Sequence, residues 1–452
     1  MKSGDVLFWI WLAEALGPAY QKTSQLLSLY DNPYDLFQAE EAELERIEDF
    51  PERVRAALSD KSLKHASDIL SACERLGISI LTYGEDEYPY VLRELADPPI
   101  LLYYIGQLPD WNRKLCVAMV GTRRMSAYGL HSSYRIAYET AMANAVVVSG
   151  MATGIDGVCS AAALAANGET VAVLGCGVDS IYPKHHRRLR DAICKRGAVI
   201  SEYPPGTEPR GYHFPARNRI ISGMSQATVV LEAGIGSGSL ITAKDAILQG
   251  RQVYALPANV GSHGAEGTNG LLRDGAKPII EAADLLEAYR HVYADTLAIN
   301  SMLQNRAAPY ADLHYLQELG VIELTEHSQK NGASVGTVAT QSLTQKKLRE
   351  AEEKSRRVTV KKKREQAESK KMEKTVAEID ECTDGGQTPD EVLSSLTPVQ
   401  QAVLAAIPDD RAISADSLNA LDYPYGDVVA ALTVLEIMGM IQKLPGALYT
   451  KL

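Results

Sequence analysis

The sequence is poor in cysteine, and its cysteines are not grouped. Among 452 residues there are six, and no two of them have C-x-x-C spacing; they are Cys73, Cys116, Cys159, Cys176, Cys194 and Cys382. Most lie inside apolar segments, as reduced and buried thiols do. Neither a disulfide framework nor a zinc site is indicated, and we expect no metal and no other cofactor.

Long hydrophobic runs are also missing. No stretch reaches the roughly 18 apolar residues of a membrane-spanning helix, and the short apolar run near the start lacks the small-residue cleavage site of a secretory signal. With 46% hydrophobic and 23% charged residues, the composition is that of a globular protein. We expect a cytoplasmic protein without a membrane partner, with about three domains at roughly 150 residues each.

Familiar nucleotide-binding and catalytic motifs are absent as well. No G-x-x-x-x-G-K-[ST] pattern occurs, and VGTRR stands where a dinucleotide-binding sheet would carry G-x-G-x-x-G. Ser149, Cys176, Asp179, His185 and His186 are available for chemistry, but no spacing pairs a nucleophile with a base. We predict a binding protein that is not an enzyme, with no catalytic residue.

Acidic residues dominate the chain, whose net charge is -11, but they are unevenly placed. Lys+Arg against Asp+Glu number 9 and 20 in residues 1–110, and 19 and 14 in residues 111–290. They number 13 and 6 in residues 341–374, and 3 and 12 in residues 375–452. Because phosphates are neutralised by local Lys and Arg, the positive central region remains a candidate nucleic-acid surface.

The two ends of the chain read as small, mainly helical modules. Residues 1–80 have helical spacing at 8–16, 24–30, 41–48 and 52–58, in the style of helix-hairpin-helix or SAM-like modules. Residues 391–452 follow the order helix, helix, helix and hairpin that is typical of a winged helix. Both modules are acidic, which favours packing or protein contacts over DNA contacts.

Between the ends, short apolar runs alternate with helical stretches. The runs lie at 115–121, 145–150, 170–175, 198–203, 227–233 and 252–258. Nearly continuous apolar strands separated by helices indicate a doubly wound, mostly parallel Rossmann-like α/β sheet, which we place at 81–290. Residues 291–390 are predicted to be a charged linker, partly helical or disordered. Its basic run at 341–374 is read as a solvated segment, with phosphate contacts as the alternative.

Chemistry should gather where the strands end, because ligands of such sheets bind at the carboxyl edge. The segment Gly236, Ser237, Gly238, Ser239 precedes a helix, so free N–H groups can meet a phosphate there. Arg123 follows the first strand. We expect its side chain to contact a ligand phosphate, and the alternative is a salt bridge to Glu202. Asp156 opens a helix and is interpreted as its N-cap.

A cluster of Arg217, Asn218 and Arg219 lies beside Phe214. A flat ring next to cations suits single-stranded nucleic acid, whose bases stack while its phosphates are neutralised. The alternative is that an arginine holds Glu232 or Glu202 in place. We expect one arginine of each kind.

These segments, taken in order, resemble one family. VGTRRMS, SGMATGIDG, VLGCGVDSIYP, SEYPPG, FPARNRIISG and SGSLITA are similar to the motifs of the DprA/Smf family of DNA-processing proteins, over about residues 88–279. The resemblance implies non-sequence-specific binding of single-stranded DNA, a homodimer, and protection of incoming DNA together with loading of the RecA recombinase during natural transformation.

The resemblance also implies roles for single residues. Gly121, Thr122 and Arg123 match G-[ST]-R, Lys184 matches a pocket lysine, and Phe214, Arg217, Asn218 and Arg219 match FPxRNR. The sequence departs from the family where a basic residue is common, at Gly211 and Gly236, and Arg210 is a substitute for the former. A histidine of the GID segment is also missing, since Cys159 and Ser160 stand there.

Two rival functions come from other classes of protein. Nucleotide phosphoribohydrolases of the lysine-decarboxylase-like group share this kind of sheet, and their P-G-G-x-G-T-x-x-E loop resembles AGIGSGSLITA. The carboxylate of that loop is replaced here by Ile241 and Thr242, so a hydrolase would lack an acid. A regulator that reads DNA through the winged helix is disfavoured by the acidity of that module.

Overall fold

The computed structural model describes residues 3–323 apart from 31, 41–42, 45–50, 263 and 306–309, then residues 396–408 and parts of 413–451. The chain divides into two compact units, Met1–Leu343 and Thr344–Leu452. Within the described ranges, no helix has the length and apolar character needed to cross a membrane.

The first unit is built on a nine-stranded sheet with the order β1-β2-β6-β5-β4-β3-β7-β8-β9. Its strands are β1 (Ser79–Thr82), β2 (Leu101–Gly106), β3 (Cys116–Gly121), β4 (Val146–Ser149), β5 (Thr170–Leu174), β6 (Ala198–Ser201), β7 (Ala227–Glu232), β8 (Gln252–Ala255) and β9 (Lys277–Pro278). All pairs from β6 to β9 are parallel, whereas β2 pairs antiparallel with β1 and β6. The predicted doubly wound, mostly parallel sheet is confirmed, with its six predicted runs as β3 to β8.

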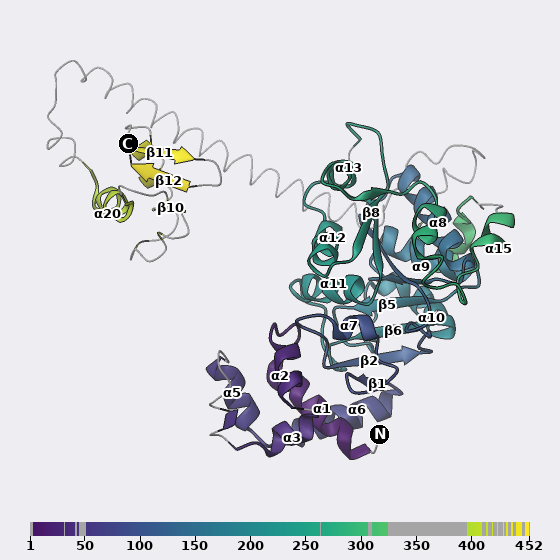
Figure 1. Cartoon of the computed structure of the whole chain (residues 1–452), viewed down its shortest axis with the longest axis horizontal. Helices are drawn as coiled ribbons and strands as arrows, with labels where there is room; N and C mark the ends of the chain where they lie inside the picture. Colours follow the sequence, from purple (N-terminus) through teal and green to yellow (C-terminus); the bar gives the residue numbers. More distant parts are fainter. Residues whose placement is uncertain are drawn as a thin grey trace. The chain divides into compact units, whose positions relative to one another are not determined.

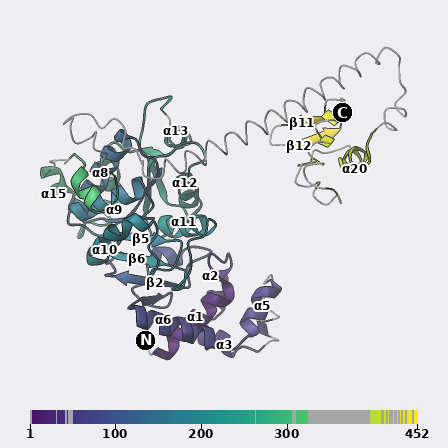
Figure 2. The ribbon, with the colours of Figure 1, turned by 180° about the vertical axis from the view of Figure 1, so that it is seen from behind.

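Helices cover both faces of this sheet (Figures 1 and 2). One face carries α8 (Ala127–Met142), α9 (Ile155–Ala165) and α10 (Arg187–Arg196), and the other carries α7 (Tyr90–Arg93), α11 (His213–Gly223) and α12 (Gly238–Leu248). Shorter elements are η1 (Lys184–His186), α13 (Glu266–Arg273), α14 (Ala283–Leu286) and η2 (Glu287–Tyr289). Val117 and Met119 of β3 join the first core, and Ala118 and Val120 join the second. Every position of β4 to β7, and of β3 up to Val120, is buried between the two layers, which explains the continuous apolar runs.

The order of the strands fixes where a ligand can enter. The chain adds β4, β5 and β6 on one side of β3, and then crosses back to place β7 on the other side. The connections after β3 and β7 therefore leave the sheet toward opposite faces, and a crevice opens between them at the carboxyl edge.

The amino-terminal helices pack on the same unit. They are α1 (Ser3–Leu16), α2 (Thr23–Leu29), α3 (Pro33–Gln38), α5 (Glu52–Ser59) and α6 (Lys64–Leu76). Helices predicted at 8–16, 24–30 and 52–58 are present, and most of the one predicted at 41–48 lies outside the described residues. Trp9 and Leu12 belong to the core that also holds Tyr103 of β2, so these helices share a hydrophobic core with the sheet.

The structure differs from the predicted linker at its start. Residues 291–323 contain α15 (Ile299–Gln304) and α16 (Leu313–Glu318), and Met302, Leu316 and Val321 are buried in the core of the sheet unit. The physical reason is that apolar side chains three to four residues apart give short helices a face to bury. The remaining part of the predicted linker, 324–390 with its basic run, lies outside the described residues.

The second unit has its own small core. Helix α20 (Pro398–Ala406) begins with a capping box between Thr397 and Gln400, and strands β10 (Ile413–Ser414), β11 (Ile441–Leu444) and β12 (Leu448–Lys451) form an antiparallel sheet in the order β10-β12-β11. The predicted terminal hairpin is present as β11 and β12. Strand β10 follows α20, at the place where the predicted order of helix, helix, helix and hairpin has the start of its second helix.

Burial of α16 gives a test of where the folded unit ends. Replacing the fully buried Leu316 by alanine should lower the free energy of unfolding by about 2–5 kcal/mol, because the lost side chain leaves a cavity. Val292 is 73% exposed, so Val292→Ala should change it by less than about 0.5 kcal/mol. Urea unfolding of both variants measures the difference; equally small effects would place α16 outside the core.

Candidate nucleic-acid interface

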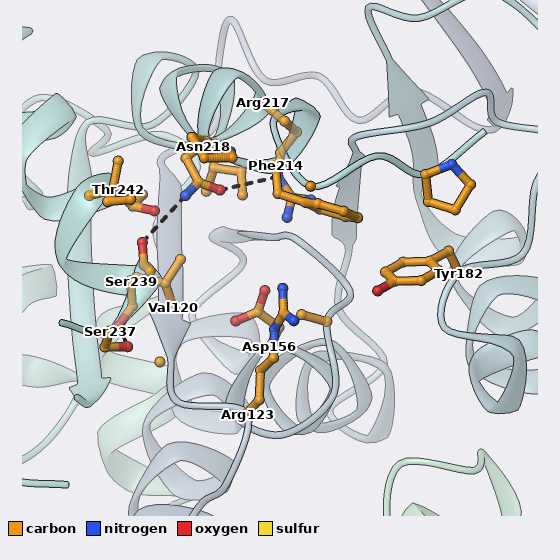
Figure 3. A pocket seen from close by; sticks show the side chains of 18 residues that line it. Val120, Arg123, Asp156, Tyr182, Phe214, Arg217, Asn218, Ser237, Ser239 and Thr242 are labelled. Atoms are coloured by element: carbon orange, nitrogen blue, oxygen red, sulfur yellow. Dashed lines mark hydrogen bonds between the residues drawn. The ribbon is translucent and has the colours of Figure 1, made fainter. Parts of the chain in front are cut away.

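A pocket of about 560 Å³ opens at the crevice between β3 and β7 (Figure 3). Its walls come from the end of β3, the starts of α9 and α12, one face of α11, and the segment before η1. The lining residues are Val120, Gly121, Arg123, Ala152, Asp156, Tyr182, Pro209, Gly211, Phe214, Pro215, Arg217, Asn218, Ile221, Ser237, Gly238, Ser239, Ile241 and Thr242. The structure thus brings together eight of the twelve predicted site residues: Gly121, Arg123, Phe214, Arg217, Asn218, Ser237, Gly238 and Ser239.

Helix α11 presents one of its faces to the pocket. Phe214, Arg217, Asn218 and Ile221 all line it, and their spacing of three, four and seven residues places them on one side of a helix. Asn218 connects this face to the neighbouring helix, since its Nδ2 donates to the Gly238 carbonyl of α12 over 3.4 Å. The FPxRNR segment is therefore a helical stripe rather than a loop.

Arg217 is the buried member of this stripe. Its guanidinium donates to the carbonyl of Gly150 over 3.0 Å and to that of Val173, so it binds the ends of β4 and β5. Burial lowers the pKa of Arg217 to about 10, which leaves the side chain charged at neutral pH. Asp156 opposes this effect, and burial in turn raises the pKa of that carboxyl.

Arg123 has the opposite character. Its side chain is exposed and makes no hydrogen bond or ion pair with any described residue, so the alternative of a salt bridge to Glu202 is not realised. Its guanidinium carbon lies 5.9 Å from the centre of the Phe214 ring, and that of Arg217 lies at the same distance. A flat ring thus carries two cations, one free and one buried, which is a cation–π arrangement.

The amino end of α12 supplies polar groups on the other side of the pocket. Ser237 is the N-cap, yet its side chain makes no capping bond; its hydroxyl lies 2.8 Å from that of Ser239 instead. The helix dipole and the N–H groups of the first turn favour an anion at this position. Figure 3 shows these serines and Thr242 across the pocket from Tyr182.

The loop after β3 is held by backbone contacts. Thr122 does not line the pocket. Its carbonyl accepts a hydrogen bond from the backbone N–H of Ile155 over 3.2 Å, and its hydroxyl accepts one from the backbone N–H of Arg124 over 3.1 Å. Gly154 has a φ of +88°, and a Cβ there would lie 2.4 Å from the Thr122 carbonyl oxygen. Thr122 therefore positions Arg123, and only glycine fits beneath it.

Arg219 is not brought to the pocket. Its Nη2 binds both carboxylate oxygens of Glu202, over 2.6 and 2.7 Å, and its Nε lies 3.3 Å from Asp97. Burial by itself would lower the pKa of Arg219, but the two carboxylates raise it. The same Glu202 accepts from the N–H of Ala19, over 3.3 Å, in the amino-terminal segment. Of the two arginines in the cluster, Arg219 is therefore the one that binds an acidic side chain, Glu202.

Lys184 and Arg210 also lie outside the lining of the pocket. Both are exposed; Lys184 begins η1, and Arg210 donates to the hydroxyl of Tyr212 over 3.1 Å. The neighbours of Arg210, Pro209 and Gly211, line the pocket. A Cβ on Gly211 would meet open space, so the rim is unfilled where the family often has a basic residue.

Sequence reasoning did not assign Asp156 or Tyr182 to the pocket. Asp156 was expected to be an N-cap, but Gly154 caps α9 and Asp156 accepts from the N–H of Gly150 over 3.1 Å. Tyr182 was not singled out, although it stands two residues before Lys184, at the end of the VLGCGVDSIYP motif; its ring lies 5.2 Å from that of Phe214. The signal available for Tyr182 was an aromatic residue close to Lys184 in the connection that follows β5.

The residues available for nucleophilic chemistry make structural contacts. The Ser149 hydroxyl donates to the Met119 carbonyl over 2.7 Å, and the Asp179 carboxylate accepts from the N–H of Gly206 over 3.0 Å. Burial raises the pKa of the Cys176 thiol and lowers the pKa of His186 to about 4. Among the described residues no cluster of His, Cys, Asp and Glu is suited to hold a metal ion.

The buried Arg219 and the exposed Arg123 predict effects of different size on stability. Arg219→Ala leaves Glu202 buried without its partner and should lower the free energy of unfolding by about 3–5 kcal/mol. Arg123→Ala removes an unbonded side chain and should change it by less than about 0.5 kcal/mol. Chemical denaturation measures both. A double variant, Arg219→Met with Glu202→Leu, should recover much of the loss; equal stability of Arg219→Ala and the parent would contradict the structural role.

Two family models and several known proteins match this chain. The family model for DNA recombination-mediator protein A matches residues 79–290, and that for the DprA winged helix domain matches residues 387–447. The chain is 38% identical to the DNA processing protein DprA of Bacillus subtilis over 219 residues, which are 48% of this chain and 74% of that one. It is 42% identical to the DprA of Streptococcus pneumoniae over 205 residues, 45% of this chain and 72% of that one.

Protein Smf of Synechocystis matches the chain throughout, with 27% identity and complete coverage of both. The X-ray structure of DprA from Streptococcus pneumoniae superposes with a TM-score of 0.53 at 32% identity, over 62% of this chain and 97% of that one. The predicted winged helix at the carboxyl end is confirmed by its own family match. The order of motifs, the sheet and the matched ranges agree, and the chain belongs to the DprA/Smf family of DNA-processing proteins.

Proposed function

We propose that the pocket binds single-stranded DNA without sequence preference. The observation that carries this proposal is the pair of guanidinium groups beside the Phe214 ring. The guanidinium carbons of the free Arg123 and of the buried Arg217 each lie 5.9 Å from the centre of that ring, and the amino end of α12 lines the same pocket. A ring gives a base a face to stack on, and the cation and the helix end give the backbone a place for its phosphates.

The same geometry favours single strands over duplex. In a duplex the faces of the bases are already stacked, so Phe214 has nothing to contact unless the strands separate. The described lining has one ring of Phe and one of Tyr, and because every base has a flat face that can stack on such a ring, the site suits binding that tolerates any sequence. Overall acidity is no obstacle, because the contacts are local.

Family membership extends the proposal to a cellular role. We infer that the protein, as a cytoplasmic homodimer, covers incoming single-stranded DNA and passes it to the RecA recombinase during natural transformation. The names of its relatives, DNA processing protein and recombination mediator, support a role on DNA of this kind. The winged helix, which is acidic, is assigned to protein contacts.

The geometry supports binding over nucleoside hydrolysis. Ile241 and Thr242 line the pocket where a phosphoribohydrolase loop would present a carboxylate. Asp156 is the one acid among the described lining residues, and it accepts hydrogen bonds from backbone N–H groups, including that of Gly150. We therefore propose that the protein is not an enzyme at this site.

Single substitutions in the pocket should weaken binding to every sequence. Arg123→Ala should raise the Kd for oligo-dT and reduce the slope of log K against log salt by about one, because one phosphate contact is lost. Phe214→Ala should raise the Kd by about 5-fold to 150-fold at an unchanged slope, since stacking contributes about 1–3 kcal/mol per base. Fluorescence anisotropy across a salt series measures both quantities.

Arg124→Ala is the matched control, because Arg124 is also exposed and charged, is adjacent in sequence, and does not line the pocket. It should leave the Kd within about twofold. Unchanged affinity in both pocket variants, or equal affinity of the parent for duplex and single strands, would contradict the assignment. A gel shift with RecA tests the recombinase separately: a supershifted complex is expected, and its absence would remove that partner only.

A further inference from the structure

Tyr182 is an aromatic side chain that the pocket holds without an evident structural need. It is 37% exposed and lies at the edge of the pocket, with its ring 5.2 Å from that of Phe214 and tilted by 37°. Its hydroxyl has no hydrogen-bond partner among the described residues. Figure 3 shows the ring on the far side of the pocket from the α12 serines, with the hydroxyl directed inward.

The two rings form a continuous aromatic surface. With centres at 5.2 Å they are too close to take a base between them, so each has to offer a separate face to a separate base. A second, smaller cavity of about 40 Å³ shares part of its lining with the pocket, including Tyr182, Phe214 and Arg217. Tyr182 and Phe214 therefore face open space in both cavities.

Two exposed cations follow Tyr182 closely in the chain. Lys184 and Arg187 follow Tyr182 within five residues; both are exposed and neither has a hydrogen bond or ion pair with a described residue. On the opposite side, the connection from Glu232 to Ser239 contains no lysine and no arginine. A backbone that leaves the pocket past Tyr182 can therefore meet two exposed cations.

We propose that Tyr182 is a second stacking residue, and that the strand leaves the pocket across it toward η1 and the start of α10, where Lys184 and Arg187 meet the next phosphates. This inference rests on the proposed function of the pocket. The strand then runs from the α12 end, over Phe214, over Tyr182, and onto the basic start of α10. This path requires at least two bases of the strand to stack, one on Phe214 and one on Tyr182.

The test compares oligo-dT with an abasic oligonucleotide of the same length, about 15 nucleotides. Tyr182→Ala should raise the Kd for oligo-dT by about 5-fold to 150-fold and leave the Kd for the abasic strand unchanged. Tyr182→Phe should bind as the parent does. Tyr182→Leu keeps an apolar side chain against Phe214 but offers no ring, and should behave like the alanine variant.

Tyr34→Ala is the matched control, because Tyr34 is 50% exposed and also has one ring neighbour, Phe8 at 5.0 Å. It should bind as the parent does. Thermal unfolding of each variant checks that the fold is kept. Lys184→Ala and Arg187→Ala should each reduce the salt slope by about one for the oligonucleotide of about 15 nucleotides, and not for one of about 4.

Two outcomes would overturn the proposal. A Tyr182→Leu variant that binds oligo-dT like the parent would show that the side chain only packs against Phe214. An equal loss on abasic and normal strands would show that no base stacks on it. Either result leaves the proposed function intact so long as Phe214→Ala still weakens binding. If neither Phe214→Ala nor Tyr182→Ala weakens binding, the pocket itself is rejected as the binding site.

Discussion

The pocket depends on one buried guanidinium. Parallel strands end with carbonyl groups that point out of the sheet, and Arg217 of α11 binds two of them, at Gly150 and Val173. This bond sets the height of α11 above the sheet, and with it the positions of Phe214 one turn before and Asn218 one residue after. The burial of a charge is costly, and nearby Asp156 offsets part of that cost.

Two arginines two residues apart have opposite tasks because of helix geometry. Positions 217 and 219 differ by about 200° around a helix, so one faces the crevice while the other faces Asp97 and Glu202. The sequence predicted that one of them would bind an acid, and the stripe at 214, 217, 218 and 221 identifies which. What was missing was the knowledge that the segment is helical, since FPARNR begins with a proline-containing stretch that reads as a turn.

Other parts of the structure could not be obtained from local pattern. Six of the parallel strands, β3 to β8, are short apolar runs and were predictable, whereas β1 and β2 pair antiparallel at an edge of the sheet, a pairing that depends on distant residues. The role of Asp156 depends on the N–H of Gly150, and that of Tyr182 on a ring 32 positions later in the chain. Such contacts exist only once the sheet has assembled.

The floor and the rim of the pocket differ in how much change they allow. Beneath Arg123, the Gly154 backbone and the Thr122 carbonyl approach so closely that no side chain fits, whereas Gly211 on the rim faces open space. The depth and position of the site are therefore fixed by main chain, while its charge is set by replaceable side chains. Relatives with this scaffold can adjust how strongly they hold an anionic ligand by exchanging a rim residue, without any rearrangement of the sheet.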